Sequence, residues 1–299
     1  MSEDSHSDSA TGLSPGADAG TALLAALARD LDRLHAAEPA VRADEPDSVH
    51  QMRVATRRLR SLLRSGRPLL ERAVVDHLRA ELRWLAGLLG RARDAEVQAE
   101  RGATGLDRLP AADRPPVARR LVRRYRSEYA EAHAATVAAL DGARYALLRK
   151  QLSGLLAAPP LRRRATRPAP EVLARLLDKE QRRLHRLVTA ADHASPSDHV
   201  AALHDVRKAA KRLRYFAEAV SPVLGTGHLA RAAKTLQSVL GDHRDALASR
   251  DALAEAAAAA RAAGEDDRPY LLLARFETTT ADTALDHYLP ALRKIRNDP

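Results

Sequence analysis

Two stretches of the chain repeat one pattern of histidine and basic residues, and these side chains are the ones best suited to chemistry. Each stretch has a histidine, an arginine three residues later, a basic residue four further on, and then Arg-Leu-Arg. The first begins at His50 and the second at His204, which is 154 residues later. Imidazolium, guanidinium and ammonium groups donate hydrogen bonds to anions, phosphate above all. The pattern therefore indicates two copies of one anion-binding segment.

On an α-helix these basic residues share one face, because each residue turns the chain by about 100°. Leu59 and Leu213 lie among apolar residues on the opposite face, which indicates that this face is buried. We call the two basic faces the cationic ladders. The first holds His50, Arg53, Arg57, Arg60 and Arg64, and the second holds His204, Arg207, Lys211 and Arg214. The neighbouring Arg58, Lys208 and Arg212 are further candidates for anion binding.

Other predicted helices are expected to add basic residues to the same surface. In a helix that is expected from about residue 70 to 90, with a continuation past Asp94 left open, basic residues share a face with Ala86 and Gly90, which are too small to obstruct a ligand. A corresponding helix is expected in the second half, and a further basic helix face between residues 117 and 140. The candidates on these segments are Arg79, Arg83, Arg93, Arg119, Arg123, Lys234 and Arg244.

The composition narrows the choice of partner. The 299 residues carry a formal charge of +10, which points to an anionic partner. Aromatic residues make up only 3%, whereas proteins that hold single-stranded nucleic acid usually stack bases on aromatic rings. The absence of cysteine excludes disulfides and thiolate sites, and no apolar run approaches the roughly 20 residues that cross a bilayer. We therefore expect a cytoplasmic protein with no membrane partner.

The chain is expected to be all-α, because apolar residues recur at helical spacing and no segment alternates with period two. Residues 1–20 predict a disordered tail without a signal peptide. Two antiparallel helical bundles are predicted at residues 21–156 and 171–299, joined by a proline-rich linker at 157–170. Matches at spacings of 150, 154 and 151 residues indicate a tandem duplication. Pro39 is expected to end the first helix near residue 37, and Asp47 or Ser48 to cap the next.

In each half the repeated histidine helix is followed by Leu-Gly, two variable residues and Arg-Asp, at Leu89 to Asp94 and Leu240 to Asp245. The two motifs, in this order and present twice, resemble the CHAD family, named for a conserved histidine α-helical domain. The resemblance covers about residues 21–296. It implies two bundles related by a pseudo-twofold axis, with basic residues lining a groove or pore between them.

The resemblance also implies a receptor for inorganic polyphosphate, and an association with polyphosphate granules, on which some relatives sit. The binding residues that it carries over are His50, Arg53, Arg57, Arg60, Arg83, Arg93, His204, Arg207, Lys211, Arg214, Lys234 and Arg244. Many relatives carry an adjoining triphosphate tunnel domain with alternating Glu-x-Glu-x-Lys. That motif is absent here, so the chain looks like a stand-alone, non-catalytic member that needs no cofactor.

Two alternatives stay open. A nucleic-acid-binding protein could use the same basic helices. A metal-dependent phosphohydrolase with histidine ligands is the weaker alternative, because His50 and His204 have no second ligand one turn away and lie among cations that repel a divalent metal. A glycine-rich phosphate loop ending in Gly-Lys-Ser/Thr is also absent. We therefore expect no metal and no catalytic residue.

Three finer interpretations follow from the same residues. A dense cationic site disfavours protonation of His50 and His204, and bound phosphate restores it, so binding is expected to be tighter near pH 6 than near pH 8. Asp94 and Asp245 are expected to orient a neighbouring arginine rather than to catalyse. The linker arginines Arg162, Arg163 and Arg164 are interpreted as solvated, with a contribution to the groove as the alternative.

Overall fold

The computed structural model describes residues 17–296, and this part of the chain is all-α with no extended strand. The long helices of the first half are α1 (Ala19–Arg42), α2 (Ser48–Ser65), α3 (Arg72–Leu106), α5 (Arg124–Asp141) and α6 (Ala143–Ala157). Those of the second half are α7 (Ala169–Asp192), α8 (His199–Leu224), α9 (Gly227–Ala262), α10 (Arg268–Asp286) and α11 (Tyr288–Arg296). The short helix α4 (Arg114–Val117) and a π-helical stretch, Ala118–Arg123, lead into α5.

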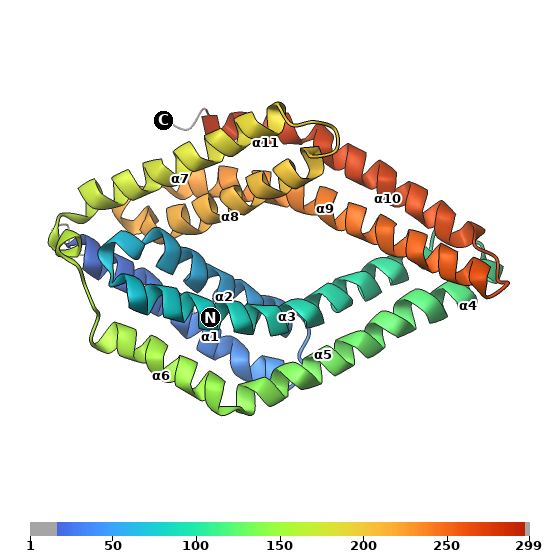
Figure 1. Ribbon diagram of the computed structural model, residues 1–299, viewed down its shortest axis with the longest axis horizontal. Coiled ribbons are helices and arrows are strands. Elements are labelled where there is room, and N and C mark those ends of the chain that lie inside the picture. The colour runs from blue at the N-terminus through green and yellow to red at the C-terminus, as the bar shows by residue number, and fades with distance from the viewer. Residues whose placement is uncertain (1–16, 297–299) are drawn as a thin grey trace, which may run out of the picture.

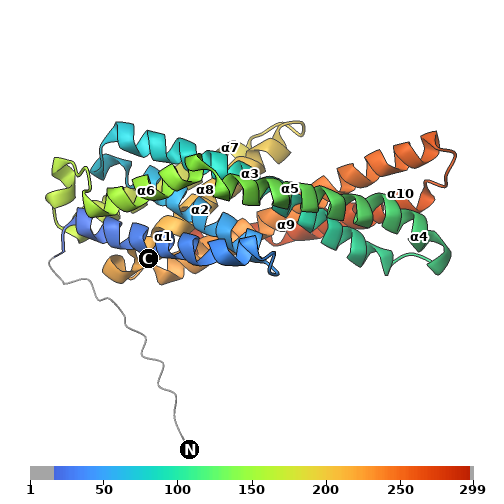
Figure 2. The same ribbon diagram turned by 90° about the horizontal axis from the view of Figure 1, so that it is seen from below.

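The two halves face each other across the middle of an elongated molecule (Figure 1). Helices α1, α2, α3, α5 and α6 lie along one side and α7 to α11 along the other. At one end the chain crosses from α6 to α7, and at the opposite end α4 and α5 approach α9 and α10 (Figure 1). We call that opposite end the distal tip. Seen from below, the molecule is long and thin (Figure 2), so each helix keeps one side near solvent.

One hydrophobic core joins the two halves, with a smaller cluster at the distal tip. Leu59 of α2 and Leu213 of α8 are 1% and 0% exposed, as the amphipathic pattern predicts. Their burial turns the opposite faces of both helices, which carry the ladders, away from the core. The distal cluster packs Val117 and Leu121 against Leu253 of α9 and Tyr270 of α10.

Several helix boundaries differ from the sequence expectations. Pro39 does not end the first helix, which continues to Arg42 and closes with the Ala43 amide donating to the Pro39 carbonyl at 3.0 Å. The proline removes one amide donor from the helix, and the chain stays helical for three more residues beyond it. Asp47 precedes α2 in a left-handed conformation with φ of 60° and makes no side-chain cap hydrogen bond, so the expected cap is wrong.

The predicted tail at residues 1–20 is also corrected at its end. Asp18 caps α1 by accepting a hydrogen bond from the Thr21 amide at 2.7 Å, and the helix begins at Ala19. Ala19 and Gly20 are buried. The rest of that segment, residues 1–16, lies outside the described residues.

The segment between α6 and α7 is packed against the first half of the molecule. Its Arg162 amide donates to the Leu69 carbonyl at 2.9 Å, and its Pro160 carbonyl accepts from the Glu71 amide at 2.9 Å. Ala165, in a short 3-10 helix, is fully buried. These contacts fix the backbone of the linker, so its arginine side chains start from defined positions.

Candidate functional site

The two cationic ladders meet around Lys211, a half-buried residue of α8. Burial, followed by the positive charges of Arg57, Arg207, Arg53 and Arg244, lowers the pKa of Lys211 from 10.5 to about 6. Two of these arginines come from α2, one from α8 and one from α9. Cations from both halves therefore converge on one point, with too little negative charge nearby to offset them.

Arg53 and Arg207 occupy matching positions in the two ladders. Burial and neighbouring arginines lower the pKa of both guanidinium groups. Asp94 of α3 opposes this at Arg53, with its Oδ1 3.3 Å from Arg53 Nη2, and the charge of Asp245 on α9 does the same for Arg207. Asp94 therefore contacts a ladder arginine, as its expected orienting role requires, and Asp245 offsets part of the positive charge around the matching one.

Two glycines let these arginines lie close to the next helix. A Cβ at Gly241 of α9 would lie 3.4 Å from Nε and Nη2 of Arg207, and a Cβ at Gly90 of α3 would lie 3.9 Å from Nε of Arg53. The small residues were expected to leave room for a ligand. In the structure the guanidinium groups of Arg53 and Arg207 lie over Gly90 and Gly241 instead.

The two histidines lie beside these arginines and are held neutral. Burial and then Arg93 lower the pKa of His50, while burial, Arg244 and Lys208 lower the pKa of His204 to about 4. Nδ1 of His204 is buried and finds no hydrogen-bond partner among residues 17–296. Each ring can therefore accept a proton when an anion offsets the surrounding positive charge.

Two adjoining cavities open along the ladders toward the linker end of the molecule. The first, which we call the ladder cavity, has a volume of about 440 Å³. Its basic lining consists of Arg57, Arg60, Arg64, Arg79, Arg183, Lys208, Lys211 and Arg212. The second, the linker cavity, has a volume of about 1120 Å³ and shares Arg64, Arg79, Arg183 and Arg212 with the first. A continuous basic surface therefore leads from Lys211 to the linker.

The electrostatics of the ladder cavity favour an anion. Burial, then Arg83 and Arg79, lower the pKa of Arg60, and burial, then Arg183 and Arg79, lower that of Arg64. The arginine contributions to these lowered pKa values mean that the neighbouring cations repel one another in the ligand-free protein. A bound polyanion removes this repulsion, and this relief adds to the hydrogen bonds that it forms.

Comparison with known proteins gives the family of the chain. The family model of the CHAD domain matches residues 25–254, which is most of the chain. The chain belongs to the CHAD domain family. Two Mycobacterium tuberculosis proteins, both described as uncharacterized, are 38% identical to this CHAD chain over 275 residues. The match covers 90% of the chain and 52% of each relative, so the chain spans about half the length of these relatives.

Two solved structures are similar to this CHAD chain in fold. PptA from Streptomyces chartreusis superposes with a TM-score of 0.77 at 23% identity, over 93% of this chain and 100% of that one. The CHAD domain from the plant Ricinus communis gives a TM-score of 0.73 at 23% identity, over 96% of this chain and 95% of that one. At this identity the two structures support the all-α fold alone.

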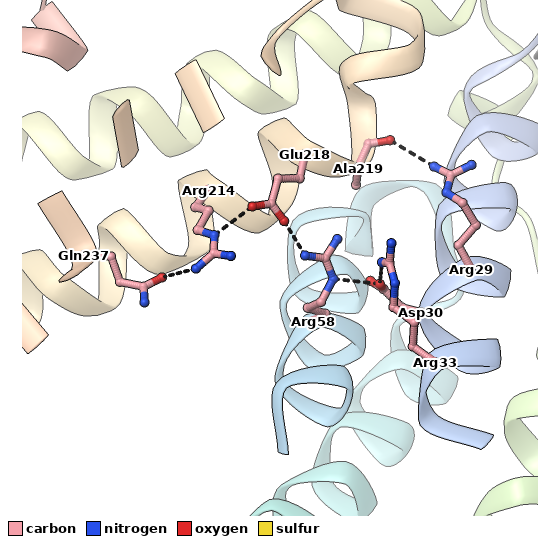
Figure 3. A network of polar contacts seen from close by, with 8 residues as sticks. All are labelled: Arg29, Asp30, Arg33, Arg58, Arg214, Glu218, Ala219 and Gln237. Carbon is pink, nitrogen blue, oxygen red and sulfur yellow. Dashed lines mark hydrogen bonds and ion pairs between the residues drawn. The ribbon is translucent and has the colours of Figure 1, made fainter. Parts of the chain in front are cut away.

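Two of the candidate residues, Arg58 and Arg214, form hydrogen bonds and ion pairs with other residues of the protein (Figure 3). Arg58 donates through Nε to Asp30 Oδ1 at 2.7 Å and also pairs with Glu218. Arg214 donates through Nε to Glu218 Oε1 at 2.7 Å and through Nη1 to Gln237 Oε1 at 3.3 Å. This network links α1, α2, α8 and α9, so Arg58 and Arg214 join the two halves of the CHAD fold.

Other predicted residues lie beside the cavities or far from them. Arg119 and Arg123 are exposed in the π-helical stretch at the distal tip and line neither cavity, so the structure does not bring them together with the ladders. Arg83 and Lys234 are exposed, and Arg83 lies close enough to lower the pKa of Arg60. Arg93 is partly neutralised by Glu96 at 2.8 Å.

Residues of α7 complete the basic surface and were not anticipated. Lys179, Arg183 and Arg186 line the linker cavity, together with the linker arginines Arg162, Arg163, Arg164 and Arg167. The signal in the sequence was the spacing of four and three residues along α7, which is the spacing that defines the ladders. The linker arginines therefore follow the alternative interpretation, in which they add to the groove.

Two negative findings concern the described residues. Between residues 17 and 296, no three His, Asp or Glu side chains gather in a way that could hold a metal ion. Over the same part of the chain, every helix is too short or too polar to span a lipid bilayer.

Proposed function

We propose that this CHAD domain binds inorganic polyphosphate, without catalysis, between its two cationic ladders. The observation that carries the proposal is the convergence of Arg57, Arg53, Arg207 and Arg244 on Lys211. Polyphosphate has about one negative charge per unit and no bases to recognise. Successive basic residues one helical turn apart, at about 5.4 Å, can contact successive or alternate phosphates. Arginine adds two parallel hydrogen bonds to each phosphate that it meets.

Nucleic acid is the competing ligand, and a competition experiment separates the two. The ladder cavity offers no exposed aromatic ring for a base, since its one aromatic residue, Tyr215, is 2% exposed. Polyphosphate is therefore expected to displace labelled single-stranded DNA or RNA at a far lower phosphate concentration than the reverse. Stronger binding of nucleic acid, per phosphate, would reject the proposal.

The non-catalytic part of the proposal has its own test. Incubation of the protein with polyphosphate and Mg²⁺ is expected to release no more inorganic phosphate than a buffer control. Phosphate release that depends on the protein and the metal would make the chain a phosphohydrolase. In cells, the proposal places the protein on polyphosphate granules, which fluorescence microscopy of a tagged chain can test.

Binding is expected to weaken as the pH rises above about 6. Lys211 has a pKa of about 6 in the free protein, and adjacent phosphates raise it in the complex. Between these two pKa values, binding takes up a proton, so affinity falls by up to about tenfold per pH unit. Below pH 6 Lys211 is already protonated, and its contribution to the pH dependence ends.

Lys211→Arg is the matched variant for this pH dependence, because guanidinium keeps its charge throughout. It is expected to bind as tightly as the wild type at pH 6 and more tightly at pH 8, as measured by calorimetry. Replacing His50 and His204 with Gln should make the affinity less dependent on pH at the acidic end of the measured range. A wild-type affinity that does not change between pH 6 and pH 8 would contradict this account of the site.

A further inference from the structure

Two clusters of polar residues occupy corresponding positions in the two predicted repeats. At a spacing of 150 residues Glu180 of α7 corresponds to Asp30 of α1, and at a spacing of 154 Arg212 of α8 corresponds to Arg58 of α2. In the first cluster Arg58 is bound by two carboxylates, Asp30 at 2.7 Å and Glu218 (Figure 3). We call this cluster closed, because two carboxylates of the protein neutralise its central arginine and leave it no free charge for a ligand.

The second cluster also contains a carboxylate paired with an arginine, but its third residue differs from that of the first cluster. Arg212 Nε lies 3.6 Å from Glu180 Oε2, while Glu180 Oε1 accepts a hydrogen bond from Ser65 Oγ at 2.9 Å. The position that matches Glu218, 154 residues earlier, is Arg64. One carboxylate of the first cluster is thus replaced by a guanidinium in the second. The second cluster is left with an excess of positive charge around a single buried carboxylate.

This excess charge faces the linker cavity. Arg64, Arg212 and Glu180 all line that cavity, and the linker contributes Arg163 and Arg164 at its rim. Nε atoms of three lining arginines, Arg67, Arg79 and Arg183, are buried without a hydrogen-bond partner among the described residues, and Arg212 Nε has only the ion pair with Glu180. Buried donors of this kind favour a ligand that supplies acceptors. Phosphate oxygens meet this need, and they also offset the charge.

We propose that the linker cavity is a second phosphate subsite, so that one linear polyphosphate occupies both cavities. The inference rests on the proposed function of the ladders and adds a dependence on chain length. The two cavities share Arg64, Arg79 and Arg183, which gives a polymer a continuous path from one to the other. Tripolyphosphate is short enough to be held at the ladders alone, whereas a long chain gains the contacts of the linker.

The test is a calorimetric titration of the double variant Arg163→Glu with Arg164→Glu. Both side chains are exposed, so the fold is expected to persist, with an unchanged circular dichroism spectrum. Long-chain polyphosphate is expected to bind at least about tenfold more weakly than to the wild type, since the linker contacts are lost. Tripolyphosphate is expected to keep its affinity to within about twofold. By analogy with nucleic acids, the plot of log affinity against log salt concentration for the long chain is expected to become less steep, its negative slope shrinking by about 2.

Arg119→Glu with Arg123→Glu is the control, because it changes the net charge equally at the distal tip. This control is expected to bind both ligands almost as the wild type does. If both double variants weaken the long chain equally, the effect is one of net charge and the subsite is refuted. Equal losses for tripolyphosphate and the long chain in the linker variant would also refute it. Failure of the wild type to bind either ligand would instead overturn the proposed function.

The variant Arg64→Glu tests, through thermal stability, whether the positive charge at position 64 leaves the second cluster without a second carboxylate partner for Arg212. It restores the carboxylate that the closed cluster has at Glu218, so a new ion pair with Arg212 is expected to form. The melting temperature of the ligand-free protein should then rise by about 2 °C. The affinity for long-chain polyphosphate should fall at least about tenfold. An unchanged or lower melting temperature would show that the charge at this position does not keep the cluster open.

Discussion

The double variant Arg57→Glu with Lys211→Glu is expected to lose measurable affinity for polyphosphate, a decrease of at least about 100-fold. Each substitution removes a charge-assisted hydrogen bond, worth about 1.5–3 kcal/mol, and adds repulsion toward phosphate. Since 1.4 kcal/mol corresponds to a factor of ten, two such losses account for the expected decrease. Titration calorimetry with polyphosphates of defined length measures it.

The matched control again places the two glutamates at Arg119 and Arg123, where the net charge changes equally and neither cavity is touched. This control separates a local loss from a general weakening of attraction. Folding of the ladder variant is not expected to suffer, because removal of Lys211 from its cationic surroundings relieves repulsion. Retention of affinity in the ladder variant would mean that the ligand binds elsewhere.

The second large effect concerns stability. Asp30 is 1% exposed and accepts hydrogen bonds from Arg58 at 2.7 Å and Arg33 at 2.6 Å. Asp30→Ala leaves Arg58, which is only 13% exposed, with a single carboxylate partner, Glu218. Breaking a buried ion pair by removal of one partner typically costs about 3–5 kcal/mol. Chemical denaturation should therefore show a decrease of that size in the free energy of unfolding.

A surface ion pair of the same chemistry provides the comparison. Asp141 pairs with Arg42 but is 63% exposed, so Asp141→Ala is expected to cost no more than about 1 kcal/mol. Equal, small losses for Asp30→Ala and Asp141→Ala would show that the buried pair between Asp30 and Arg58 in Figure 3 stabilises the fold no more than a surface ion pair does.

The sequence allowed the ladders to be predicted but not the partners of each ladder residue. Helical spacing places a side chain on a face of its own helix, and Arg57 and Lys211 could be assigned to the site on that basis. Arg58 follows Arg57 by one residue and turns about 100° away, toward Asp30 and Glu218. Those acids lie 28 and 160 residues away in the chain, so no local pattern could reveal them.

The places of the distal tip and of the linker depend on contacts that a single segment does not reveal. Helix α3, whose predicted extent reached residue 90 and could pass Asp94, continues to Leu106, so the following segment, with Arg119 and Arg123, lies far from the ladders. The linker was identified from its prolines, which say little about packing. Burial of Ala165 and the backbone hydrogen bonds of Arg162 fix it beside the cavity. Tertiary contacts of this kind follow from the fold as a whole and not from a single segment.

The central claim is that both ladders hold one polyphosphate chain, and a crystal structure of the complex with long-chain polyphosphate tests it most directly. We expect one continuous run of phosphates within hydrogen-bond distance of Arg57 on α2 and of Lys211 on α8. Phosphates that contact one ladder only, or that lie outside the two cavities, would contradict the claim.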